Sequence, residues 1–138
     1  MFFRILGTRI LTLFRWMHPV VVGLTLAGCA SVVVIPPLEG LPPDAPEQRI
    51  KITAQKYRFE PETIKVPINT HVIIDIESLD VMHGFKLERY GIDKEIPVKG
   101  EGTVAVEFYT REIGTYKFKC SHICGIMHPW MNGKLVVE

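Results

Sequence analysis

Residues 103–120 of this 138-residue chain read TVAVEFYTREIGTYKFKC. The first eight of these residues alternate in polarity, so that one face would carry Val104, Val106 and Phe108. A period of two residues is what a half-buried β-strand requires. Gly114 then interrupts the pattern before a second β-rich run. The stretch therefore predicts two neighbouring strands joined by a turn.

Similar short runs, separated by proline and glycine, continue on both sides of this stretch through residues 50–138. None of them keeps the 3.6-residue period of a helix. About seven strands within about 90 residues predict an all-β fold, a Greek-key sandwich or a small barrel. The expected strands are Ile50–Lys56, Thr63–Val66, His71–Glu77, Gly84–Glu88, Thr103–Thr110, Thr115–Cys120 and Lys134–Val137.

The segment CSHICGIMHPWM, residues 120–131, gathers ligands for soft and borderline metals between two predicted strands. Cys124, His128 and Met131 have the spacing of a mononuclear blue-copper site, in which a thiolate, an imidazole and a weak thioether share one ion. Such a site needs a second histidine from elsewhere in the chain. His83, at the start of a predicted strand, is the candidate.

Cys120 gives this set one thiolate too many for a single copper ion. Two thiolates four residues apart can instead bridge two copper ions, with one histidine terminating each ion. The combined pattern resembles the CuA domain of cytochrome c oxidase subunit II and of nitrous oxide reductase. The resemblance covers roughly residues 50–138, from KYRFEPETIKVP through SLDVMHGF to CSHICGIMHPWMNGKLVVE.

This resemblance implies a cupredoxin-like fold and a binuclear copper site with two ions per chain. At the position of His122, the family uses a main-chain carbonyl oxygen. The large A-type oxidases typically have a glutamate there that also helps to hold magnesium or manganese, and the histidine departs from that pattern. The short chain resembles subunit II of the B-type haem–copper oxidases more closely. The implied ligands are His83, Cys120, His122, Cys124, His128 and Met131.

Protein donors would fill this copper site, so no position stays open for a substrate. We therefore expect electron transfer, with no catalysis by this chain alone. The resemblance implies a cytochrome c or cupredoxin as electron donor. The acceptor would be the catalytic subunit of a haem–copper oxidase, with this chain as subunit II, or a separate reductase. Tyr57 and Trp130 are the candidate residues for electron entry.

Other interpretations of the same residues stay open. A periplasmic copper metallochaperone or a mononuclear blue-copper protein is the alternative function. Four of the residues, His83, Cys120, Cys124 and His128, could hold a structural zinc ion. The two cysteines could also form a disulfide in an oxidising compartment. Asp80 could orient His83 through a hydrogen bond or could cap a turn.

Residues 1–35 differ in composition from the rest of the chain. Three arginines and no acid precede or flank the uncharged run VVVGLTLAGCASVVVI, residues 20–35, which predicts a signal peptide or a membrane anchor. The sequence LAGC within this run resembles a bacterial lipobox, in which Cys29 would be lipidated. Either interpretation attaches the chain to the cytoplasmic membrane and places the following domain on its extracytoplasmic side.

Residues 36–49, PPLEGLPPDAPEQR, contain five prolines and predict an extended linker before a domain at residues 50–138. Such a strut would reach on the order of 40 Å. Three of the 16 basic residues precede Glu39, so the remainder has 13 basic and 15 acidic residues. The sequence shows neither a basic patch nor a nucleic-acid-binding motif, and we exclude nucleic acid as a partner.

Overall fold

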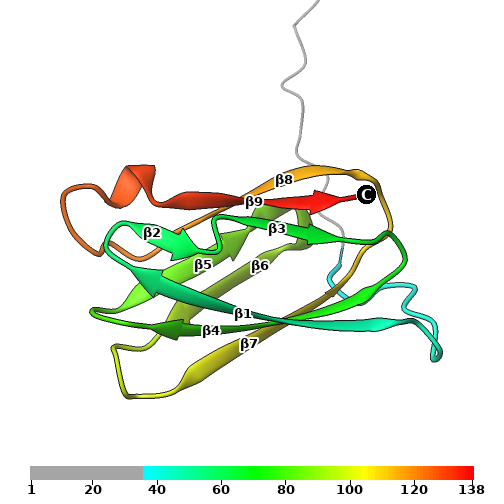
Figure 1. The fold of residues 1–138 in the computed structure, drawn as a ribbon, viewed down its shortest axis with the longest axis horizontal. Helices are drawn as coiled ribbons and strands as arrows, with labels where there is room; N and C mark the ends of the chain where they lie inside the picture. The colour runs from blue at the N-terminus through cyan, green and yellow to red at the C-terminus, as the bar shows by residue number, and fades with distance from the viewer. Residues whose placement is uncertain (1–35) are drawn as a thin grey trace, which may run out of the picture. The chain divides into compact units, whose positions relative to one another are not determined.

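The computed structural model describes residues 36–138, which form a β-sandwich with two short 3-10 helices (Figure 1). No α-helix occurs in this part of the chain, so the predicted all-β fold is confirmed. The elements are β1 (Glu47–Gln55), β2 (Arg58–Glu60), β3 (Thr63–Val66), β4 (His71–Ser78), β5 (His83–Leu87), η1 (Glu88–Tyr90), β6 (Ile92–Ile96), β7 (Thr103–Tyr109), β8 (Gly114–Lys119), η2 (His128–Trp130) and β9 (Asn132–Val137).

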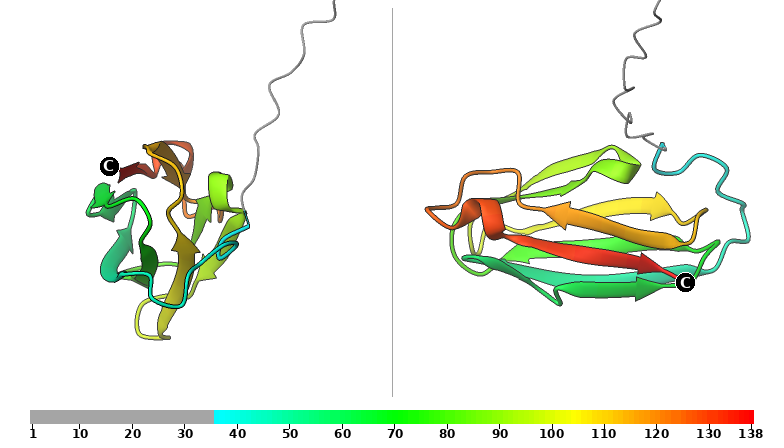
Figure 2. Two further views of the ribbon diagram at one scale, coloured as in Figure 1. Left: turned by 90° about the vertical axis from the view of Figure 1, so that its right-hand side faces the viewer. Right: turned by 90° about the horizontal axis from the view of Figure 1, so that it is seen from above.

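Two mixed sheets make up the sandwich. One has four strands in the order β2-β1-β4-β7, and the other has five strands in the order β3-β9-β8-β5-β6. The pairs β1–β4 and β3–β9 are parallel, and every other described pair is antiparallel. The view along the strands shows the two layers facing each other (Figure 2). The inward side chains of both sheets therefore share one core.

Three phenylalanine rings connect the two sheets inside this core. Phe59 on β2 lies 5.3 Å from Phe118 on β8 and 6.0 Å from Phe85 on β5, measured between ring centroids. The rings of Phe85 and Phe118 are 5.1 Å apart, and all three side chains are buried. Aromatic pairs at these separations add to the stability that burial provides. Phe85 and Phe118 lie two residues from His83 and Cys120, so the core fixes the strands that carry these residues.

Two short strands were not predicted from the sequence. β2 has only three residues, and Phe59 is its single buried side chain. β6 reads IDKEI, with three consecutive exposed charged residues between two buried isoleucines. It is an edge strand, where charged residues keep the free edge from pairing with another chain. Its outward side is solvated, so the strand lacks the alternation that marks a half-buried strand.

The expectation of an extended proline-rich strut is wrong for residues 36–46. Backbone hydrogen bonds close three turns in this segment, and the Tyr109 N–H donates to the Pro37 carbonyl at 2.7 Å. Glu39 also lies 3.5 Å from Arg111. Proline suits the first corner of a turn as well as an extended chain, and the free edge of β7 offers the N–H donor. The segment therefore packs against the sandwich, and β1 begins at Glu47.

The predicted leader or anchor, residues 1–35 with Cys29, lies outside the described residues. Between residues 36 and 138, the structure has no helix that is both long enough and apolar enough to cross a membrane.

Candidate metal centre

The candidate ligands gather at one end of the five-stranded sheet. β5 begins with His83, and β8 ends at Lys119, immediately before Cys120. Lys119 pairs with Lys86 on β5 and with Asn132 on β9, so the start of β5, the end of β8 and the start of β9 share this end. The connection between β8 and β9, the ligand loop, spans residues 120–131 and contains η2. Three strands thus position the predicted ligands.

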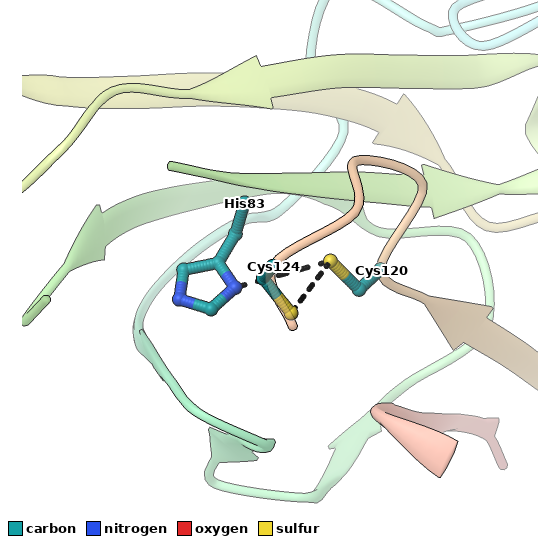
Figure 3. A group of neighbouring side chains, drawn as sticks. All are labelled: His83, Cys120 and Cys124. Atoms are coloured by element: carbon teal, nitrogen blue, oxygen red, sulfur yellow. Dashed lines mark hydrogen bonds between the residues drawn. The ribbon is translucent and has the colours of Figure 1, made fainter. Parts of the chain in front are cut away.

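The two cysteines face each other beside His83 (Figure 3). The Cys120 Sγ lies 4.0 Å from the Cys124 Sγ and 3.9 Å from the His83 Nδ1. Ligand atoms of these three residues are all within 4.8 Å of one another. Both cysteines are free thiols, because their separation is about twice the length of an S–S bond. The structure thus contains a reduced pair, without the disulfide.

The remaining predicted ligands adjoin one or other of these sulfur atoms. The His128 Nδ1 lies 3.9 Å from the Cys124 Sγ, and the Met131 Sδ lies 3.8 Å from the same sulfur. The Cys120 thiol donates to the His122 carbonyl oxygen at 3.1 Å. Each sulfur therefore has an imidazole nitrogen and a weak donor beside it. The structure brings all six predicted residues together.

His83, Cys120 and Cys124 form a compact group, and His128 lies beside Cys124. His128 does not belong to the group of three residues whose ligand atoms lie mutually within 4.8 Å. A tetrahedral zinc site requires four ligands about a single point, each at about 2.0–2.3 Å from the ion. Thiolate, imidazole and thioether donors together match copper chemistry.

Asp80 fixes the orientation of His83. Its Oδ1 lies 2.7 Å from the His83 Nε2 and accepts the Val81 N–H, while its Oδ2 accepts the Lys56 N–H. Burial disfavours the charged carboxylate, but these hydrogen bonds outweigh it and hold the pKa of Asp80 below its usual value. A proton held on Nε2 leaves the Nδ1 of His83 free to face the sulfur atoms. Asp80 therefore orients His83, one of the two roles that the sequence suggested, and also accepts hydrogen bonds from two main-chain N–H groups.

The thiols and His83 also influence one another's protonation. Burial opposes ionisation of Cys120, but its interaction with the His83 imidazole and the hydrogen bond from the Gly84 N–H outweigh it and lower the pKa of this thiol to about 6. Burial and the nearby Cys120 raise the pKa of Cys124 to about 11. Burial also acts to lower the pKa of His83, yet its bonds to Cys120 and Asp80 raise it overall. A metal ion would replace the remaining protons.

Gly84 is a positioning residue that the sequence analysis missed. Its N–H lies 3.4 Å from the Cys120 Sγ. A Cβ at this position would lie 2.7 Å from the His122 N and 2.9 Å from the Ser121 N, and would also collide with the Ser121 hydroxyl. Only glycine lets the ligand loop approach β5 this closely. A glycine directly after a candidate ligand, inside a predicted strand, was the available signal.

β6 holds the first half of the ligand loop from the other side. The Ser121 hydroxyl donates to the Asp93 carboxylate at 2.6 Å. The His122 Nδ1 lies 3.6 Å from the Glu95 carboxylate, so its imidazole interacts with β6 and its carbonyl with Cys120. These contacts fix the main chain at the carbonyl. The role of β6 was also missed, because the strand itself was not predicted.

The centre is enclosed, with one accessible side. His83 and Met131 have no exposed surface, and Cys120 and Cys124 are 4% and 5% exposed. His128 is half-buried. The ligand loop also exposes four large apolar side chains: Ile123, Ile126, Met127 and Trp130. We call these four residues the apolar rim.

The two candidate residues for electron entry differ in exposure. Trp130 is 64% exposed and belongs to the apolar rim. Tyr57 is half-buried, and its hydroxyl oxygen lies 2.6 Å from the point where a Cβ of Gly125 would be. Gly125 has a φ of 139°, which strongly favours glycine. Tyr57 therefore packs under the ligand loop, whereas Trp130 faces solvent.

Comparison with known proteins agrees with the resemblance noted in the sequence. Cytochrome c oxidase subunit 2 of Thermus thermophilus is 32% identical over 89 residues, which cover 64% of this chain and 64% of that protein. Nitrous-oxide reductase of Cupriavidus necator is 27% identical over 93 residues, covering 64% of this chain and 14% of the enzyme. The chain thus spans less than two thirds of the length of either relative.

The fold has close counterparts among solved structures. The periplasmic domain of subunit II of cytochrome oxidase from Bradyrhizobium japonicum superposes with a TM-score of 0.60 at 19% identity, covering 71% of this chain and 87% of that one. The family described as cupredoxin-like domain matches residues 19–137. On the strength of that match and of the shared two-sheet fold, the chain belongs to the cupredoxin-like domain family.

Proposed function

We propose that this protein is a one-electron carrier with a binuclear copper centre of the CuA type. The ligands would be the Cys120 and Cys124 thiolates, the His83 and His128 imidazoles, the Met131 thioether and the His122 carbonyl oxygen. Copper bound there would supply the one-electron exchange. The chain itself supplies the donors, holds them in place and keeps water away from them.

The position of Cys120 carries this proposal. A mononuclear site would need only one thiolate, yet two free thiols face each other at 4.0 Å inside the domain. Each thiol has an imidazole nitrogen 3.9 Å away, that of His83 beside Cys120 and that of His128 beside Cys124. A mononuclear blue-copper site would leave Cys120 and one of these contacts without a purpose. The paired arrangement provides for two ions.

Burial and rigidity favour electron transfer over copper delivery. A metallochaperone must expose its ligands to an acceptor, but His83 and Met131 have no exposed surface. Asp80, Gly84 and β6 hold the donors through hydrogen bonds and close packing. A preorganised ligand set needs little rearrangement when the charge of the centre changes. These features suit rapid exchange of electrons with the metal retained.

Electrons would enter through the apolar rim. His128 is the only one of the two candidate imidazoles with exposed surface, and Trp130 follows two residues later. Isolated apolar side chains are common on protein surfaces, but four neighbouring ones on one loop favour contact with a partner. Trp130 is a better contact residue than Tyr57, which lies beneath the loop. The electron donor would be a cytochrome c or a cupredoxin.

The relatives suggest the cellular setting. The Thermus thermophilus relative is a subunit of cytochrome c oxidase, and the Bradyrhizobium japonicum domain is periplasmic. We infer an extracytoplasmic domain attached to the cytoplasmic membrane through residues 1–35, with Cys29 as the lipidation site if the leader is cleaved. The acceptor would be the catalytic subunit of a haem–copper oxidase, or another reductase. The intact mass of the native protein distinguishes a lipidated chain from an uncleaved anchor.

The test of the copper centre is metal content together with electron paramagnetic resonance. The full chain is loaded with copper under mild reductant and freed of excess metal. We expect about two copper ions per chain and one unpaired electron whose hyperfine splitting involves both nuclei. About one ion, with a splitting from a single nucleus, would reject the binuclear centre and favour the blue-copper alternative.

Two variants sharpen this test. Cys120→Ser should reduce the copper content to about one ion per chain and give a single-nucleus spectrum. Cys29→Ser is the matched control, because it makes the same substitution at the one other cysteine of the sequence, which is not a predicted metal ligand. It should keep both ions. Rapid transfer of copper to a chelator, at the same rate in the native chain and in the Cys120 variant, would instead support the metallochaperone.

A further inference from the structure

The outer face of the five-stranded sheet carries a cluster of lysines. Each one alternates along its strand with side chains buried in the core. The sequence suggested no basic patch, and that expectation is wrong, because the cluster forms only when four strands lie side by side. Its members, the lysine face, are Lys65 on β3, Lys86 on β5, Lys117 and Lys119 on β8, and Lys134 on β9.

Two pairs of these lysines lie directly opposite each other on neighbouring strands. In the first pair, Lys86 faces Lys119. The Glu88 carboxylate lies 2.8 Å from the Lys119 ammonium and 4.0 Å from that of Lys86, and Asp93 lies 3.5 Å from Lys86. The repulsion between this pair of like charges is therefore compensated within the domain.

The second pair, Lys117 and Lys134, has no such compensation. The two residues are direct partners in the β8–β9 ladder, and both are exposed. Within residues 36–138, neither ammonium group has a carboxylate within 4.0 Å. Residues 1–35 contain no Asp or Glu, so they cannot supply one. Like charges directly opposite each other destabilise a sheet. Anionic groups of another molecule would relieve this repulsion.

The surroundings of these lysines indicate which kind of molecule this is. Thr63, Thr115 and Val136 lie between them, and these strands expose no large apolar side chain on this face, although Ile113, just before β8, is exposed. Protein interfaces are depleted in lysine and depend on buried aromatic or arginine anchors. A lysine ammonium is a compact, hydrated point charge that needs no particular geometry in its partner. Such a face is better suited to binding a planar array of anionic groups than to binding a protein surface of defined shape.

We propose that the lysine face binds the anionic lipid headgroups of a membrane surface. This inference rests on the membrane attachment in the proposed function, which would keep the domain close to a bilayer. The strands would then lie along the membrane, and the ligand loop at their end would point sideways (Figure 1). The apolar rim would stay accessible to an electron donor that moves along the same surface.

Amine labelling of the full chain on vesicles tests this proposal. The chain is mixed with vesicles of phosphatidylcholine, or of phosphatidylcholine with phosphatidylglycerol, and treated with an acylating reagent. Mass spectrometry of peptides gives the extent of labelling at each lysine. We expect the anionic vesicles, and not the neutral ones, to protect Lys117 and Lys134 from acylation. Added salt should abolish this protection. Lys51, on the outer face of the other sheet, should be labelled equally in both.

Paired variants provide the control. One lysine near an anionic bilayer contributes about a fivefold change in affinity, so Lys117→Gln with Lys134→Gln should lower the bound-to-free ratio by about 25-fold. Lys65 and Lys119 remain as reporters of that ratio. Lys51→Gln with Arg58→Gln removes the same charge from the other sheet and should leave the ratio unchanged. Neither pair touches the core.

Three results would overturn the proposal: equal labelling in both kinds of vesicle, protection that both paired variants reduce equally, or protection in neutral vesicles. The last would indicate contact with protein. Flotation of the chain with neutral vesicles tests the N-terminal attachment separately. The chain could float with vesicles while Lys117 and Lys134 stay unprotected on anionic vesicles. That result would support the N-terminal attachment and refute lipid binding by the lysine face.

Discussion

Replacing Gly84 by alanine tests whether close packing between β5 and the ligand loop holds the metal centre together. The added Cβ would lie 2.7 Å from the His122 N and 2.9 Å from the Ser121 N. These are main-chain atoms, so no side chain can rotate away. The loop would have to move by on the order of half an ångström or more to reach ordinary contact distances.

The structure sets the size of the expected effect. Extra atoms in a closely packed site typically cost about 1–3 kcal/mol. Movement of the loop would also lengthen the hydrogen bond from the Gly84 N–H to the Cys120 Sγ, which is already 3.4 Å. We therefore expect the free energy of unfolding to fall by about 1–3 kcal/mol. The reduction potential of the loaded protein should fall as well, since hydrogen bonds to a ligand sulfur help to set it.

Denaturant unfolding of the metal-free chain under reductant measures the first effect, and a redox titration of the copper-loaded chain measures the second. Gly114→Ala is the control, because the nearest atom to its added Cβ is the end of the Tyr116 side chain at 3.0 Å. Equal stability of the two variants, with an unchanged potential for the Gly84 variant, would refute the reasoning.

Three further changes test other parts of the structure. The hydroxyl of buried Tyr90 has no hydrogen-bond partner among residues 36–138. Tyr90→Phe should therefore raise the free energy of unfolding by about 1 kcal/mol. A lower free energy of unfolding would contradict this, because it would mean that the hydroxyl has a hydrogen-bond partner. Burial raises the pKa of Tyr90 to about 12, so native stability should fall as pH rises above about 10, and less in this variant. Asp80→Asn weakens the hydrogen bond to His83 and should lower copper affinity about 10- to 100-fold, measured by competition with a chelator; unchanged affinity would contradict the orienting role. Trp130→Ala should slow reduction by the electron donor while copper content and unfolding stay the same, as stopped-flow mixing would show; an unaltered rate would exclude Trp130 from electron entry.

Most of the fold could be predicted, because it depends on alternation along single strands. The predicted ranges coincide with seven observed strands to within a few residues, including β7, where Val104, Val106 and Phe108 share one face. β2 is too short to show a period, and β6 presents three charged residues in a row at a sheet edge. The prediction of an extended proline-rich segment was wrong for a different reason. Whether such a segment extends or turns depends on what it contacts, here the free N–H of Tyr109.

Most residues of the candidate site could also be predicted from the sequence. Ligand type and spacing within the ligand loop indicated two thiols, an imidazole and a thioether in one place. His83, which precedes Cys120 by 37 residues, was predicted as a ligand, and the structure places its Nδ1 3.9 Å from the Cys120 Sγ. Gly84 and β6 were not found, because their roles are contacts between segments far apart in the sequence. Metal binding itself is still a prediction for the experiments above.

The sequence by itself determined the class of fold and the set of donor atoms, since both follow from residue type and local spacing. Only the tertiary structure decided three further features: the position of an imidazole beside each thiol, the contact of Gly84 with the ligand loop, and the lysine face. The lysine face depends on which strands are neighbours and in which register, so that Lys117 lies opposite Lys134, with 16 residues between them in the sequence. Pairing between strands is a property of the folded chain, and no local pattern encodes it.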